Sequence, residues 1–347
     1  NKIAKAYTKL NQDDKAIGVY LKLILLKRNL GDEYSDILYT VADLYKGQSK
    51  YDEALSYYKQ YIQVKSESKS EEERLSLAKV YEDMAQICQN QNKFDEALGH
   101  YEKALKIQAA IYGDDDPYLA YYHDAIGDIF SQQEKYTLAL ESYQAGLQVR
   151  LPRAAEISAD LEESYYNLGN TYHKLQDFKA AIDSYNKALQ LAVITKGDED
   201  PKLARYYERI AKVYSDQEEY ELAISNYVKC VEVQGESDDS STLQIALWYN
   251  EMAKLYTKQQ KYQEAFLCYN KSLEKRIKVF GDDHPSLVSI YTYLGFANTN
   301  QGDFDRAKEL YMKSLDILKK EHPSGHPNIV ELENILKQMD TFSQKAI

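Results

Sequence analysis

Small, apolar and aromatic residues recur along this chain at helical spacings of three, four and seven residues. In the clearest stretch, residues 165–189, Gly169 and Ala181 stand twelve residues apart, and Tyr185 follows four residues after Ala181. Variants of this arrangement occur eight times. Such spacings place the apolar side chains on one face of a helix, whereas a strand would show strict alternation. The pattern therefore predicts pairs of helices repeated along the chain, with no strands.

The register of the repeat is set by one alanine in the second helix of each pair. From the third pair onward this alanine recurs at intervals of 42 residues. A small residue lets two helix backbones approach closely, and a ring from the next turn fills the adjoining gap. We therefore expect helical hairpins at residues 1–30, 34–66, 71–112, 116–152, 157–196, 200–236, 241–280 and 284–321, and a capping helix at 326–342 that covers the end of the stack.

Three links between hairpins share one sequence pattern, in which glycine is followed by acidic residues and a proline. They read GDDDP at 113–117, GDEDP at 197–201 and GDDHP at 281–285. Glycine in a left-handed turn ends a helix, acidic residues favour the next helix N-terminus, and proline fits its first turn. The links lack the twelve-residue spacing of a calcium loop. We interpret them as helix caps, with weak cation binding as the alternative.

The ordered set of small, aromatic, Ala and Tyr positions resembles the tetratricopeptide repeat, although the usual period is about 34 residues. The 42-residue period, the phrase CQNQNKFDEAL at 88–98 and the three links are similar to the repeat domain of kinesin light chains. The resemblance implies an all-α, right-handed superhelical solenoid of about eight hairpins with a C-terminal capping helix. It also implies that ligands lie along a concave groove lined by the first helix of each hairpin.

The groove positions are expected six, three and two residues before, and one residue after, the small residue of each first helix. Repeats two to four place six carboxylates and one base there, whereas repeats five to eight place four bases and three carboxylates. The alternative is a solvated helix face with pairs such as Arg205 and Glu208. The candidate partner-binding residues are Glu82, Asp83, Asp124, Asp128, Tyr166, Asn167, Asn170, Arg205, Arg209, Lys212, Asn250 and Lys254.

Composition narrows the classes of function. The net charge of -12 and a pI near 5.1 argue against a nucleic-acid partner, which needs a basic face. Three cysteines without a CxxC pair indicate reduced thiols. No P-loop, GxSxG, dinucleotide-binding glycine pattern or HExxH occurs, and His322 and His326 lie among Pro and Gly. We expect no catalysis, no cofactor, no metal site and no membrane insertion.

The expected function is that of a protein-interaction scaffold or adaptor. Its partner would be a peptide or helix that is basic toward repeats two to four and acidic toward repeats five to seven. Asp124 and Asp128 argue against a chaperone C-terminus, whose carboxylate they would repel. The resemblance implies cytoplasmic cargo binding of the kinesin-light-chain type. One alternative is a structural subunit of a cytoskeletal or ciliary assembly, including a microtubule-motor complex. The other is a regulatory array attached to an enzyme, in which case the enzyme domain would lie outside this sequence.

Overall fold

The computed structural model describes residues 2–66, 70–153, 158–235, 239–323 and 325–345. Within these ranges it contains 17 α-helices, three short 3₁₀ helices and no strand, so the all-α prediction is confirmed. Each predicted hairpin range corresponds to two consecutive α-helices, although the first helix of the seventh hairpin begins at Asp239, two residues before the predicted start. Residues 1, 157 and 236, at which three of these ranges begin or end, lie outside the described residues. The handedness of the solenoid stays a prediction.

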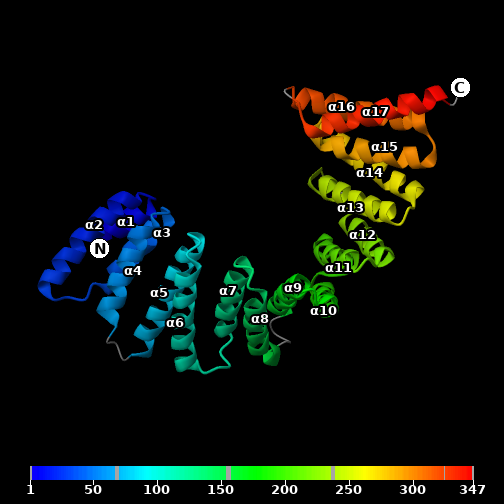
Figure 1. Ribbon diagram of the computed structural model, residues 1–347. Helices are drawn as coiled ribbons and strands as arrows, with labels where there is room; N and C mark the ends of the chain where they lie inside the picture. The colour runs from blue at the N-terminus through cyan, green and yellow to red at the C-terminus, as the bar shows by residue number, and fades with distance from the viewer. Residues whose placement is uncertain (1, 67–69, 154–157, 236–238, 324, 346–347) are drawn as a thin grey trace. The chain divides into compact units, whose positions relative to one another are not determined.

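The helices divide between two compact units, residues 1–171 and residues 172–347, which we call the N-terminal and the C-terminal unit. In each unit, successive helices lie side by side (Figure 1). The first group is α1 (Lys2–Lys9), α2 (Asp13–Leu30), α3 (Ser35–Gly47), α4 (Tyr51–Lys65), α5 (Glu71–Asn90), α6 (Phe94–Tyr112), α7 (Tyr118–Gln132), α8 (Tyr136–Arg150), η1 (Leu151–Arg153) and α9 (Ser158–Lys174), with the boundary falling inside α9.

The C-terminal unit continues the same alternation of first and second helices. Its elements are α10 (Phe178–Lys196), η2 (Pro201–Leu203), α11 (Ala204–Asp216), α12 (Tyr220–Gln234), α13 (Asp239–Lys258), α14 (Tyr262–Phe280), η3 (Pro285–Leu287), α15 (Val288–Gln301), α16 (Phe304–Glu321) and α17 (Pro327–Lys345). The apolar face of α17 buries Ile329 and Leu332 against α16. This is the capping helix that the sequence predicted.

The repeated alanines and tyrosines form the contact between the two helices of each hairpin. All eight alanines of the second helices are 0% exposed, and the eight tyrosines four residues later are at most 4% exposed. At Gly127 the Tyr143 ring lies so close that an added Cβ would be 2.8 Å from its Cδ1 and Cε1 atoms, and Gly295 has the same relation to Tyr311. The small and large residues therefore interlock as the register predicted.

Every hairpin turn contains a residue with positive φ, seven residues after the small residue of the first helix. In the eighth turn this residue is a glycine, whereas in the other seven it is a non-glycine residue with φ between 53° and 62°. The next residue's amide donates to a carbonyl five residues back, as Lys93 does to Cys88 at 2.8 Å. This hydrogen bond ends the first helix and reverses the chain. The non-glycine residues are Asn11, Ser49, Asn92, Glu134, Gln176, Glu218 and Gln260.

In two of the three links an aspartate side chain caps the next helix as predicted, whereas in the third the His284 ring accepts the corresponding hydrogen bond from the Ser286 amide. The backbone geometry of the glycine also differs from the prediction. The Asp200 side chain accepts a hydrogen bond from the Lys202 amide at 2.8 Å, and Pro201 lies in the first turn of η2. Gly197 has φ 91° and ψ 165°. This is not the left-handed helical turn that we expected but an extended conformation at positive φ, which is essentially restricted to glycine.

Two glycine substitutions test the close contact between helices. Gly127→Ala is expected to lower the free energy of unfolding by about 1–3 kcal/mol, because Tyr143 is buried and its hydroxyl is held by Asp128 at 2.6 Å, so the ring cannot move aside. The matched change Gly99→Ala on α6, where no atom lies within 4 Å of the added Cβ, should instead raise it by about 0.5–1 kcal/mol through helix propensity. Urea unfolding followed by circular dichroism measures both, and equal effects would contradict the interlocked packing.

Candidate functional site

The first helices of the hairpins place the predicted groove residues in very different environments. Glu82 and Asp83 are 3% and 1% exposed, so the structure differs here from the expected groove surface. Asn250 is also buried, at 8% exposure. The other nine candidates are half-buried or exposed on α7, α9, α11 and α13. The buried three can therefore contribute to binding only through the residues that they hold.

Glu82 is bound by side chains of its own helix and of the next hairpin. Its Oε1 accepts from Lys79 at 2.7 Å and from Gln86 at 3.4 Å. Its Oε2 accepts from the Tyr118 hydroxyl at 3.0 Å and from the Tyr122 hydroxyl at 3.5 Å. Both tyrosines lie on α7, so this carboxylate joins the third hairpin to the fourth.

Asp83 makes the corresponding connection in the other direction along the stack. Its Oδ2 accepts from the Tyr39 hydroxyl on α3 at 3.0 Å, and its Oδ1 pairs with Lys46 at 2.6 Å. Lys79 Nζ lies 3.8 Å from the same Oδ1. A buried carboxylate needs such donors to offset its lost hydration. Glu82 and Asp83 therefore hold α3, α5 and α7 together.

Asp124 and Asp128 on α7 remain partly accessible and are also bound. Arg150 at the end of α8 pairs with Asp124 at 2.6 Å and donates to the Ser164 hydroxyl on α9 at 2.9 Å. Burial raises the pKa of Asp124 to about 6, although the Arg150 guanidinium acts in the opposite direction. Burial also raises the pKa of Asp128, against the effect of its hydrogen bond from Tyr143.

The predicted residues of the fifth repeat follow one another on α9 as half-buried side chains. These are Tyr166, Asn167 and Asn170. The Thr171 hydroxyl donates to the backbone carbonyl of Asn167 at 2.8 Å. This hydrogen bond does not involve the side-chain amide of Asn167. The structure thus presents these polar groups on one helix of the N-terminal unit.

In the C-terminal unit the predicted basic residues lie on α11 and α13. The Arg205 guanidinium lies 5.2 Å from the centre of the Tyr206 ring, and Arg209 is half-buried. Lys212 pairs with Glu208 on its own helix, and Lys254 pairs with Glu251 at 2.7 Å. The two lysines therefore have their charges partly balanced within the unit.

Glu208, which is half-buried where Glu82 is buried, accepts a corresponding pair of hydrogen bonds from the next hairpin of the C-terminal unit. Its Oε2 accepts from Gln244 at 3.3 Å and from the indole of Trp248 at 3.2 Å, both on α13. The two donors follow 36 and 40 residues after the carboxylate, as Tyr118 and Tyr122 follow Glu82. This link was not predicted, although hydrogen-bonding side chains 36 and 40 residues after a glutamate can be read from the sequence in both places.

Two pockets lie beside these networks, one in each unit. The first, of about 330 Å³, lies between α3 and α5 in the N-terminal unit and is lined by Asp36, Tyr39, Thr40, Tyr61, Ser76 and Lys79. The second, of about 410 Å³, is lined by three cations and one carboxylate together with Trp248. Its charged residues are Lys196, Lys202, Arg205 and Glu208. The N-terminal pocket contains three predicted groove positions of α3.

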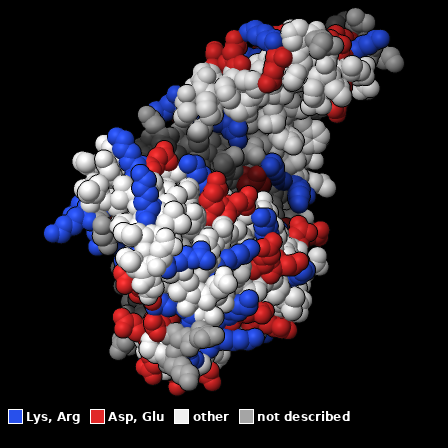
Figure 2. Space-filling view, turned by 90° about the vertical axis from the view of Figure 1, so that its left-hand side faces the viewer, with Lys and Arg blue, Asp and Glu red and all other residues white. Residues whose placement is uncertain are grey.

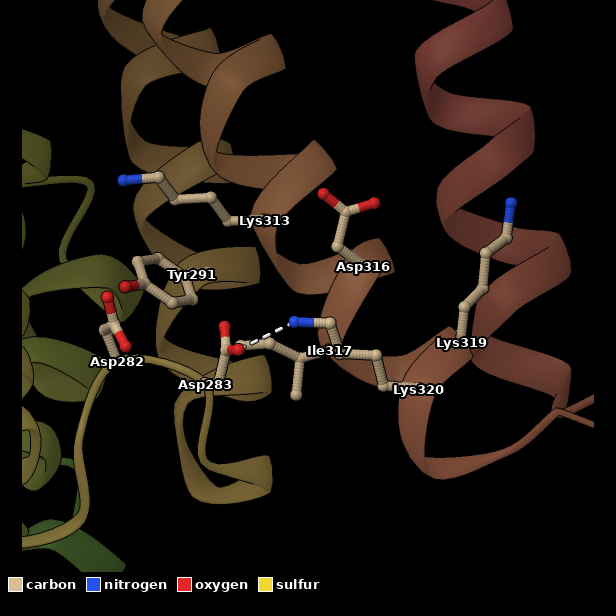
Figure 3. Close-up of a pocket in the computed structure, with 8 residues that line it drawn as sticks. All are labelled: Asp282, Asp283, Tyr291, Lys313, Asp316, Ile317, Lys319 and Lys320. Carbon is tan, nitrogen blue, oxygen red and sulfur yellow. Dashed lines mark hydrogen bonds and ion pairs between the residues drawn. The ribbon is translucent and has the colours of Figure 1, made fainter.

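A third pocket, of about 500 Å³, lies between the link that follows α14 and the helix α16 (Figure 3). Lys320 pairs with Asp283 at 2.6 Å across it, and Lys313 lies 5.6 Å from the centre of the Tyr291 ring. Lys319 points toward α17, where it pairs with Glu333 at 2.7 Å (Figure 3). Three lysines and three aspartates line this pocket, so its charges favour neither an anion nor a cation.

The surface in Figure 2, which looks onto the left-hand side of Figure 1, mixes basic and acidic side chains without a large area of one sign. Among the described residues, no group of three or more His, Cys, Asp or Glu side chains could hold a metal ion. None of the described helices is long and apolar enough to span a membrane.

Family models of the tetratricopeptide repeat match residues 1–34, 35–68, 76–151, 160–236 and 244–320. No curated protein matches the chain. The chain is similar in structure to the C-terminal part of a tetratricopeptide repeat-containing protein from Cytophaga hutchinsonii, with 17% identity and a TM-score of 0.62 over 85% of this chain and 98% of that one.

Two further solved structures share the fold. A signal transduction ATPase with a tetratricopeptide repeat sensor from Pyrococcus horikoshii aligns with 15% identity and a TM-score of 0.58, over 91% of this chain and 46% of that one. The repeats of a putative kinesin light chain from Podospora anserina align with 17% identity and a TM-score of 0.51, over 59% of this chain and 98% of that one. At these identities the likeness shows the fold alone.

Proposed function

We propose that this chain, which belongs to the tetratricopeptide repeat family, is a non-catalytic adaptor whose N-terminal unit binds a basic segment of a partner protein along α3, α5 and α7. The observation that carries the proposal is the set of carboxylates that keep contact with solvent on α3 and α7. These are Asp36, Asp43, Asp124 and Asp128. The complementary ligand is a peptide or helix with Lys or Arg side chains.

The buried carboxylates of α5, Glu82 and Asp83, do not alter the negative charge of the surface formed by α3 and α7. Glu82 and Asp83 are balanced by the ammonium groups of Lys79 and Lys46, which lie within 2.7 Å of them. Among the described residues, Arg150 is the one cation within 3 Å of these four carboxylates, at Asp124, whereas Lys46 is 3.8 Å from Asp43. The field in front of α3 and α7 is therefore negative.

The C-terminal unit is proposed to bind an acidic segment. Arg205 and Arg209 lie on α11, and Arg205 also lines the pocket that contains Lys196 and Lys202. The single carboxylate of that pocket, Glu208, already accepts hydrogen bonds from Trp248 and Gln244. A carboxylate of a partner would meet an excess of positive charge there.

Charge reversal tests the two halves of the proposal separately. An alternating Gly-Lys peptide should bind the native chain, and the double change Asp36→Lys and Asp43→Lys should weaken it about tenfold, with a smaller loss at high salt. The affinity for an alternating Gly-Glu peptide should instead fall about tenfold in the double variant Arg205→Glu with Arg209→Glu. Fluorescence anisotropy of labelled peptides measures both.

Each double variant serves as the control for the other peptide, because the changed residues lie in different units. If each double variant loses binding of both peptides, the effect is one of general charge. If the Gly-Lys peptide binds unchanged to the aspartate variant, or the Gly-Glu peptide to the arginine variant, that half of the proposal is refuted. Circular dichroism checks that the variants keep their helical content.

The finer role that we propose is cargo binding of the kind that the resemblance to kinesin light chains implies. It is supported by the 42-residue period, by the three acidic links and by the shared fold of the Podospora anserina repeats. The same charge-reversal variants, used as baits beside the native chain, separate cargo held by these surfaces from proteins that bind elsewhere.

A further inference from the structure

Tyr61 departs from the pattern of the repeat. It stands seven residues after Ala54 on α4, and at this place all six later hairpins have a small, buried residue, whereas the first has Leu23. A ring at this position is therefore not needed for the packing of a hairpin. The small residues are Ala104, Gly146, Ala188, Cys230, Ser272 and Ser314.

The Tyr61 ring forms part of the pocket between α3 and α5. Its centre lies 6.1 Å from that of Tyr39, and the two ring planes are inclined at 64°. Tyr39 cannot turn freely, because its hydroxyl donates to the buried Asp83 at 3.0 Å. Tyr61 is 4% exposed and is fixed by its burial. Two aromatic rings thus form a rigid part of the wall.

One carboxylate at this pocket is not balanced by a neighbouring cation. Asp36, in the first turn of α3, is exposed and forms no ion pair with any residue that the structure describes. The Thr40 hydroxyl donates to the Asp36 backbone carbonyl at 2.7 Å and not to its carboxylate. Lys79, the one base in the lining, is held by Glu82 and Asp83. The pocket therefore combines a negative charge with two ring surfaces.

We infer that this pocket is a socket for one cationic side chain, Lys or Arg, of the partner's basic segment. The inference rests on the proposed function and specifies it. The aliphatic stem of such a side chain packs against the rings of Tyr39 and Tyr61, while its charged end meets the Asp36 carboxylate. An apolar side chain would bury Asp36 without a partner, and an anion would be repelled by it.

The experiment uses a single-residue probe, N-acetyl-lysine methylamide, beside the alternating Gly-Lys peptide. Saturation-transfer NMR is expected to show binding of the probe to the native chain and none of the uncharged norleucine analogue. Asp36→Asn and Tyr61→Leu, which installs the residue that the first hairpin has, should each weaken the probe about fivefold or more. Tyr57→Leu is the matched control, because that ring lies on the same helix and stacks on Tyr45 outside the pocket.

The outcomes separate the socket from the proposed function. If the native chain binds the Gly-Lys peptide but not the lysine probe, or if Tyr61→Leu and Tyr57→Leu have the same effect, the socket is refuted and the basic-segment proposal stands. If the Gly-Lys peptide itself does not bind, the proposed function fails first. Should Tyr61→Leu not fold, Asp36→Asn decides, since its side chain is exposed and its amide has the same shape.

Discussion

Glu82→Ala is expected to lower the free energy of unfolding of the N-terminal unit by about 3–5 kcal/mol. The change leaves the hydroxyls of Tyr118 and Tyr122 and the ammonium of Lys79 without the carboxylate that binds them. Because Tyr122 is 1% exposed, water cannot readily replace the lost acceptor. Urea unfolding followed by circular dichroism measures the effect.

The control for this change is Asp43→Ala, which removes an exposed carboxylate that lies 3.8 Å from Lys46. It should cost less than about 0.5 kcal/mol. If the two substitutions cost the same, Glu82 would not be the connection between α5 and α7 that its contacts indicate.

Asp124 is expected to make the N-terminal unit less stable as the pH rises from about 4 to 6. The fold raises the pKa of this carboxyl to about 6, so in that window the folded chain holds a proton that the unfolded chain has lost. The stabilising effect is complete below the unfolded pKa, near 3.9, and disappears as the pH passes the folded pKa. The difference amounts to about 3 kcal/mol.

Asp124→Asn removes the titrating group while keeping an oxygen that can accept from Arg150. The native-minus-variant difference in the free energy of unfolding should therefore be larger at pH 4 than at pH 7, measured by urea unfolding. Glu33→Gln provides a control of opposite sign, because hydrogen bonds from Ser35 lower the pKa of Glu33. A difference for Asp124→Asn that is independent of pH would mean that the fold does not raise the pKa of this carboxyl.

The sequence was sufficient to predict the hairpins because their packing depends on residues that are close together along the chain. Gly127 and Tyr143 are sixteen positions apart within one hairpin, and this spacing recurs in all eight. The positive-φ residues of the hairpin turns, such as Glu134, were not predicted, because no glycine marks them. The spacing of residues along the chain therefore predicts the helices and their pairing but not the backbone conformation of the turns between them.

The candidate site was less predictable because burial at its positions depends on the next hairpin. Glu82 occupies a position that we expected to face the groove, yet two tyrosines from α7 donate to its carboxylate here. Tyr61 was missed for the opposite reason, since the repeat pattern predicts a small residue there. Departures from the repeat, compared across neighbouring hairpins, would have been the better guide to both.

The bond between Trp248 and Glu208 also has a spectroscopic use. Trp248 is the single tryptophan of the chain, and it is 3% exposed with its indole nitrogen bound to a carboxylate. Its emission should therefore shift to longer wavelength when α11 and α13 separate. Excitation at wavelengths that tyrosine does not absorb would report on this one junction, and on acids entering the pocket beside it, without any attached label.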